Sequence, residues 1–161
     1  MSPLQELLDR QAIVDAVVRW ATALDDKDWE AARACLGDEI EADYGDLRGS
    51  AAHMGAEAFV ALRREALGPL RTHHLSTNHL VELAGDEATC RSAFLIHRLD
   101  PALPEPNTYD SLGHYEHGLR RIDGAWRIVR ARQTVAWSRG NAAIHAGARP
   151  AEGAGGQPAA R

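Results

Sequence analysis

The chain has 161 residues, of which 45% are hydrophobic and 25% are charged, and these values fit one globular domain with its own core. A formal net charge of −5 and the lack of a basic run argue against a protein that binds the nucleic acid backbone. The N-terminal segment has neither a basic start nor a long apolar run. We therefore expect no signal peptide, no membrane span and a cytoplasmic location.

The first part of the chain is expected to be helical. Apolar periodicity predicts helix over residues 4–36, with a break near the aspartates of "LDDKDW", and a further helix over residues 55–67. Between them, residues 39–49 are expected to form a short strand and a turn. Cys35 and Cys90 lack motif spacing and are expected to be reduced core residues.

The second half of the chain changes to a strand pattern. Strands are predicted over residues 72–83, 87–99, 109–121 and 125–137. The turn signals "AGD" and "IDG" join two pairs of these strands as hairpins, and the proline-rich residues 100–107 form a loop. Helices followed by a meandering sheet predict an α+β fold. We expect one domain over residues 1–137 and a largely disordered segment over residues 138–161.

Three aspartates stand close together where the first helix pattern ends. The apolar row of this helix is Val14, Val17, Val18 and Ala21. Continuing the row brings Leu24 and Asp25 to the core-facing side, whereas Asp26 and Asp28 fall away from it. Two interpretations of Asp25 are open. It either caps the next helical turn or points inward, where a carboxylate needs a partner because an unpaired buried charge is costly.

Histidine is the natural partner for an inward carboxylate, and the sequence has eight histidines. In "THHLSTNHLVEL", strict alternation places His74 and Asn78 on one face and His73 and His79 on the other. Alternation alone leaves open which face is inside. Several histidines beside an inward carboxylate favour a catalytic site, because histidine is the usual general base near neutral pH.

The motifs "LDDKDW", "ADYGD", "THHLSTN", "FLIH" and "GHYEHGLRRIDGAWRIVRAR" occur in an order that resembles the SnoaL-like branch of the nuclear transport factor 2 superfamily. The likeness covers roughly residues 5 to 137 and is greatest to the subgroup of scytalone dehydratase and hexachlorocyclohexane dehydrochlorinase. It implies a cone-shaped α+β barrel, in which a curved, mostly antiparallel sheet wraps the helices around a deep pocket. It also implies a homo-oligomer, either a dimer or a trimer.

The resemblance assigns roles to four residues. Asp25 matches the helix aspartate that pairs with a catalytic histidine, and His74 matches that histidine. His97 stands where the dehydratase keeps a second histidine near the departing hydroxyl. Tyr44 matches a tyrosine that polarises the substrate carbonyl through water.

Five further residues are expected to contact the substrate. By resemblance, Arg132 falls near a pocket arginine of the dehalogenating relative. Two positions depart from the family pattern, because Leu24 replaces a tyrosine of the dehydratase and Trp20 replaces a lysine of the dehalogenating enzyme. Tyr115 is expected to line the pocket. Asn78 either bonds to substrate or ties down neighbouring backbone.

The sequence thus predicts a lyase that uses a His–Asp dyad to remove a proton from a small hydrophobic, cyclic or polyketide-like substrate. No metal and no organic cofactor are expected, because the histidines of "HYEH" point to opposite faces of a strand. Two alternatives remain. One is a non-catalytic ligand-binding or oxygenase assembly subunit of the same fold. The other is a ketosteroid-type isomerase or cyclase, in which Asp25 itself is the base.

Overall fold

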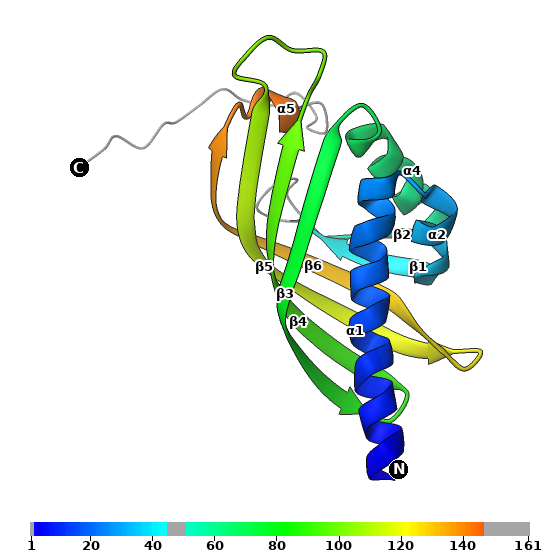
Figure 1. Ribbon diagram of the computed structural model, residues 1–161. Coiled ribbons are helices and arrows are strands. Elements are labelled where there is room, and N and C mark those ends of the chain that lie inside the picture. Colours follow the sequence, from blue (N-terminus) through cyan, green and yellow to red (C-terminus); the bar gives the residue numbers. More distant parts are fainter. Residues whose placement is uncertain (1, 45–50, 147–161) are drawn as a thin grey trace.

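The computed structural model describes residues 2–44 and 51–146 (Figure 1). The helices are α1 (Pro3–Asp26), α2 (Trp29–Ala34), α4 (Ala56–Leu67) and α5 (Ala143–Ala146). The strands are β1 (Leu36–Asp43), β2 (Ala52–Gly55), β3 (Arg71–Ala84), β4 (Glu87–Leu99), β5 (Thr108–Ile122) and β6 (Ala125–Gly140). None of the described helices is long and apolar enough to cross a membrane.

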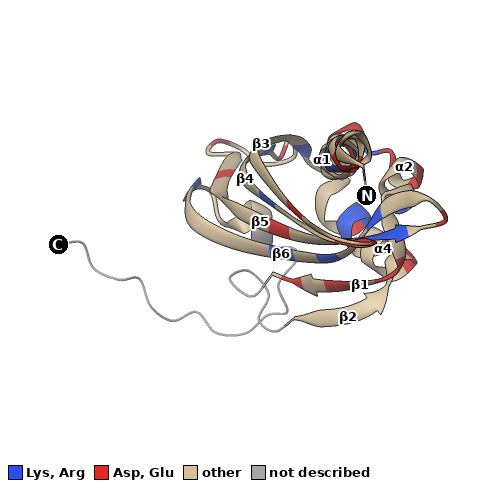
Figure 2. Ribbon diagram, turned by 90° about the horizontal axis from the view of Figure 1, so that it is seen from below, with Lys and Arg blue, Asp and Glu red and all other residues tan. Residues whose placement is uncertain are grey.

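The six strands form one open sheet in the order β2-β1-β6-β5-β4-β3. Every neighbouring pair is antiparallel except β1 and β6, which run parallel. The long strands β3 to β6 bend strongly, and α1 lies alongside β3 (Figure 1). Lysine, arginine and acidic residues are scattered over helices and strands alike (Figure 2). The predicted α+β fold is therefore confirmed, with a curved and mostly antiparallel sheet.

Local signals set the ends of α1. Ser2 caps the helix by accepting a hydrogen bond from the Gln5 amide, Pro3 occupies the first turn, and Lys27 ends the helix with a φ of 60°. The buried row differs from the expected one. Its apolar members are Ile13, Ala16, Val17, Trp20, Ala23 and Leu24. Val18 is 40% exposed, whereas the large side chains of Trp20 and Leu24 are buried.

A β-bulge interrupts the alternation of β3. Thr77 pairs with Ala93 and Leu80 with Arg91, so Asn78 and His79 together oppose a single residue of β4. Asn78 adopts a φ of 55°, which is tolerated by asparagine. Strict alternation therefore fails after Thr77, and the inward face passes from His74 to odd-numbered residues such as Val81.

The expected domain boundary at residue 137 falls inside β6, which continues to Gly140. Beyond it, Ile144 of α5 is buried against Leu70 and Tyr109. The remainder of the segment for which disorder was expected, residues 147–161, lies outside the described residues. Cys35 and Cys90 are both buried and free.

A buried ion pair ties the first half of α1 to the β5–β6 hairpin. Arg121 donates to both carboxylate oxygens of Asp9, at 2.9 and 2.8 Å, and Trp126 Nε1 adds a third bond at 3.3 Å. The Arg121 hydrogen bonds hold the pKa of Asp9 at about 2, well below its usual value. Asp9 thus stays ionised at neutral pH and joins residues more than a hundred positions apart.

We predict that Asp9→Asn lowers the urea midpoint of unfolding, because it removes the charge that the Arg121 guanidinium binds. Asp15→Asn is the matched control, since Asp15 lies on the same helix and, among the described residues, its side chain bonds only to Gln11. Equal midpoints for the two variants would contradict the prediction.

One histidine belongs to the core. His117 on β5 is 2% exposed, its ring stacks on Tyr115 at 5.0 Å between centroids, and neither ring nitrogen has a hydrogen-bond partner among the described residues. Burial lowers the pKa of His117 to about 4, so the imidazole is neutral at neutral pH.

Protonation of His117 is expected to oppose folding in mild acid. The unfolded histidine binds a proton near its ordinary pKa, while the folded one binds it only near 4, so the free energy of unfolding falls as pH decreases between these values. The free energy of unfolding is expected to fall by roughly 3 kcal/mol over this pH range. Denaturant unfolding at several pH values should show a flatter dependence for His117→Phe than for wild type. His114→Gln, on the exposed face of β5, should leave the dependence unchanged.

Candidate active site

The structure separates the three clustered aspartates into three environments. Asp28 caps α2 by accepting a hydrogen bond from the Ala31 amide at 2.9 Å, and Asp26 is exposed. Asp25, near the last turn of α1, has a side chain that is only 16% exposed. The two interpretations of Asp25 are thereby resolved: it points toward the sheet, and a neighbouring aspartate performs the capping.

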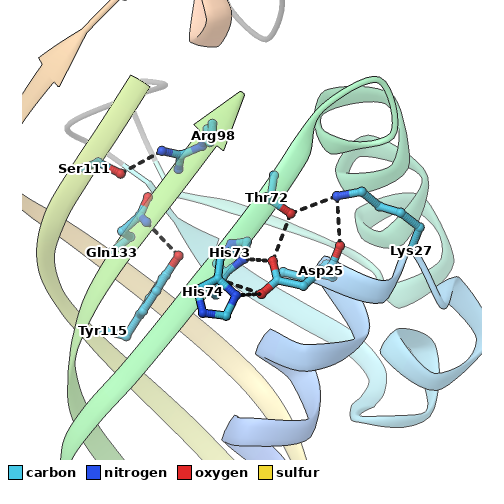
Figure 3. Close-up of polar contacts among 10 residues, drawn as sticks. Asp25, Lys27, Thr72, His73, His74, Arg98, Ser111, Tyr115 and Gln133 are labelled. Atoms are coloured by element: carbon cyan, nitrogen blue, oxygen red, sulfur yellow. Dashed lines mark hydrogen bonds and ion pairs between the residues drawn. The ribbon is translucent and has the colours of Figure 1, made fainter. Parts of the chain in front are cut away.

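Asp25 contacts His74 on the edge strand β3 (Figure 3). The distance between His74 Nδ1 and Asp25 Oδ1 is 2.5 Å, and the His74 amide donates to Asp25 Oδ2 at 2.7 Å. The Thr72 hydroxyl adds a bond to Oδ1 at 2.9 Å, and Lys27 Nζ in turn donates to that hydroxyl at 2.8 Å. Both carboxylate oxygens are therefore bound by donors from β3.

These donors determine the charge of Asp25. Burial favours the neutral carboxyl, but the hydrogen bonds from His74 and Thr72 outweigh it and hold the pKa of Asp25 below its ordinary value. An ionised Asp25 requires the proton of His74 to lie on Nδ1, because a carboxylate can only accept. The other ring nitrogen, Nε2, is then free to accept a proton. No hydrogen bond to it is formed by the described residues.

His74 lines a small cavity between the helices and the sheet. Its lining residues include five that were predicted from the sequence, namely Trp20, Leu24, Tyr44, His74 and Tyr115. The cavity volume is about 30 Å³, which holds little more than water, so a larger ligand must displace lining side chains. Tyr115 accepts a hydrogen bond from Gln133 Nε2 at 2.6 Å, and this leaves its hydroxyl proton free to be donated.

Two predicted site residues point away from the cavity. His97 follows the inward-facing Ile96 and lies on the outer face of β4, where its side chain is 48% exposed and bonds to Asp110. Arg132 is 62% exposed and pairs with Asp43 at 3.4 Å. The expected roles of His97 and Arg132 in the pocket are therefore wrong. Strand alternation explains the position of His97, because alternate residues of β4 face outward.

A second bulge explains why Arg132 points outward. In β6, Ile128 pairs with Leu119 and Arg130 with Gly118, so Val129 is an extra residue. Alternation from Ile128 would place Arg132 inside; the bulge turns it outward and brings Gln133, which is 5% exposed, into the cavity. The pocket role expected for Asn78 is likewise wrong, because the β3 bulge leaves its side chain exposed and outside the lining.

Sequence analysis missed three polar residues of the cavity, Arg63, Arg98 and Gln133. Signals for the two arginines were present. Arg98 continues the alternating buried row of β4 after Ile96, and Arg63 lies one turn after Phe59 on the buried side of α4. Gln133 had no such signal, because its position depends on the bulge.

A second, smaller cavity of about 20 Å³ lies on the other side of His74 and is lined by Ser76, Phe94 and His117 among others. A larger hollow lies elsewhere on the described surface. It is an open groove of about 940 Å³ on the outer face, with lining residues that include Glu39, Glu82 and Arg120. That groove contains neither member of the Asp25–His74 pair, so we place the candidate active site in the enclosed cavities.

Within the described ranges, no group of three or more His, Cys, Asp or Glu side chains is arranged to hold a metal ion. The side chains with polar groups that line the 30 Å³ cavity are an imidazole, two phenols, two guanidiniums, an amide and the indole of Trp20. Such groups can transfer protons and bind oxygen atoms of a ligand.

The chain is similar to known proteins in sequence and in fold. A dehydratase of Pestalotiopsis microspora is 27% identical over 136 residues, which are 78% of this chain and 86% of that protein. A solved protein of Kribbella flavida is 23% identical with a TM-score of 0.82, covering 87% of this chain and 98% of its own. A hexachlorocyclohexane dehydrochlorinase of type 2 is also 23% identical, with a TM-score of 0.74 and coverage of 89% and 96%.

At these identities the two solved structures show that the fold is shared. The family model of the SnoaL-like domain matches residues 5–132, which is most of the chain. The protein therefore belongs to the family of SnoaL-like domains.

Proposed function

We propose that the protein is a small-molecule lyase that catalyses a dehydration or a related elimination without an organic cofactor. The observation that carries this proposal is the 2.5 Å contact between His74 Nδ1 and an ionised Asp25, beside a cavity lined by Tyr44 and Tyr115. The relatives named as a dehydratase and a dehydrochlorinase support the same class of reaction.

In the proposed reaction, His74 Nε2 removes a proton from a carbon next to a carbonyl group or beside a carbon that bears a halogen. The electron pair of the C–H bond forms a double bond, and the hydroxyl or halide departs. Asp25 keeps Nε2 unprotonated beforehand and stabilises the imidazolium afterwards. Asp25 thus acts through His74 as a positioning residue.

Tyrosine hydroxyls supply the acid side of the reaction. Burial raises the pKa of Tyr115, so its hydroxyl remains protonated and can donate to a developing enolate oxygen. Tyr44 lies in the same cavity and is buried. Because His97 lies on the outer face, a departing hydroxyl takes its proton from Tyr44 or from the protonated His74.

The alternative isomerase mechanism would use Asp25 as the base. Both oxygens of Asp25 already accept hydrogen bonds, and its pKa is held below the ordinary value, so it is a weak base. A purely ligand-binding protein would not require this hydrogen-bonded pair. The same contacts therefore favour His74 as the base over both alternatives.

We predict that His74→Gln lowers kcat by about 10²- to 10⁴-fold, the usual contribution of a positioned general base. Asp25→Asn should lower kcat by a comparable factor, because an amide facing Nδ1 favours the wrong tautomer. Activity would be sought on β-hydroxy ketones and chlorinated cyclic compounds, by the absorbance of the new double bond and by chloride release.

The chain contains a matched control for both variants. His97 and Asp110 form the same type of Nδ1–carboxylate contact on the outer face. His97→Gln and Asp110→Asn should leave kcat nearly unchanged. A large loss in Asp25→Asn with a small loss in His74→Gln would instead identify Asp25 as the base and overturn the proposed dyad.

A further inference from the structure

Two buried arginines reach the cavity of His74 from different elements. Arg63 comes from α4 and is 8% exposed, and Arg98 comes from β4 and is 3% exposed. Arg98 Nη1 donates to the Ser111 hydroxyl at 2.9 Å (Figure 3). Within the part of the chain that the structure describes, neither guanidinium forms an ion pair.

Donor groups of both arginines remain unused. The Nε atoms of Arg63 and Arg98 are buried, and among the described residues they have no hydrogen-bond partner. Arg63 lies over the rings of Tyr44 and Phe59, at 5.0 and 5.3 Å from their centroids. The ring faces attract the positive charge, but they do not accept from the buried Nε–H group in the guanidinium plane. Unpaired buried donors are costly, so their retention calls for a ligand.

The described lining of the cavity supplies no carboxylate to pair with these arginines. None of the described residues that line this cavity is an aspartate or a glutamate. Asp25 is bound by His74, and Asp110 pairs with His97 and Arg139 on the outer face. Burial lowers the pKa of Arg98, and the charge of Arg63 acts in the same direction. The cavity therefore carries an excess of positive charge beside the proton-accepting nitrogen of His74.

We propose that Arg63 and Arg98 form an anion site for a carboxylate of the substrate, so that the enzyme acts on an organic acid. A guanidinium presents parallel N–H groups that match a planar carboxylate.

The anion site would fix the orientation of the substrate in the cavity. With its carboxylate at the arginines, the remainder of the molecule extends along Tyr115 toward His74, since these residues line the same cavity. The carboxylate serves as an anchor, and the proton that His74 removes belongs to a carbon activated by another group. As an assignment of substrate class, the inference rests on the proposed function, and it replaces the purely hydrophobic substrate expected from the sequence.

The test uses the full chain and two pairs of probes, acetate against acetamide and benzoate against benzamide. Binding is followed through the Trp20 indole N–H resonance, because Trp20 lines the cavity. We expect each acid to bind at least roughly tenfold more tightly than its neutral amide. Arg98→Gln and Arg63→Gln should each remove most of this preference. Arg132→Gln and Arg139→Gln, which alter exposed arginines of the same sheet, should keep it.

Equal binding of acid and amide to the wild type would overturn the anion site, and this comparison requires no variant to fold. A preference that survives both Arg98→Gln and Arg63→Gln would overturn it as well. His74→Gln separates the two proposals, because it should keep the preference for the acids while losing turnover. Turnover that persists in His74→Gln would contradict the proposed dyad but would not contradict the anion site.

Discussion

The site depends on how one carboxylate is held at the end of a helix. Asp25 stands near the last turn of α1 and receives three hydrogen bonds from Thr72 and His74 of β3. These bonds join the helix to the edge strand of the sheet. They also fix the carboxylate charge, and through it the tautomer of His74. One set of contacts therefore links the packing of the fold to the chemistry of the cavity.

The His74–Asp25 and His97–Asp110 pairs are of the same chemical type, and their environments differ. The His74 side chain is 8% exposed and borders enclosed cavities, whereas the His97 side chain is 48% exposed on the outer face. Solvent around His97 screens electrostatic interactions and competes for its hydrogen bonds. The drier surroundings of His74 strengthen its electrostatic interactions and its hydrogen bonds. Contact alone thus does not define a catalytic dyad, and burial beside a cavity must accompany it.

The proposed reaction and the proposed anion site share one electrostatic arrangement. The cavity combines the His74 imidazole with two guanidiniums, and the nearby ionised Asp25 is already held by hydrogen bonds from His74 and Thr72. A substrate carboxylate would balance the arginines, and the negative charge that develops during proton removal would be stabilised by them and by Tyr115. Burying Arg63 and Arg98 costs folding free energy, which is consistent with a functional rather than a structural role.

Periodicity in the sequence predicted the long helices and strands, and motif order indicated the family resemblance that implied the Asp25–His74 pair, because both are local properties of the chain. The short elements β2 and α5 were not predicted. Periodicity placed the ends of the four long strands within three residues of those observed. Only the tertiary structure decided which side chains face the cavity. Single-residue bulges after Thr77 and Ile128 reverse the alternation, which exposes Asn78 and Arg132 and buries Gln133. Such bulges arise from how neighbouring strands pair, and a linear pattern does not contain that information.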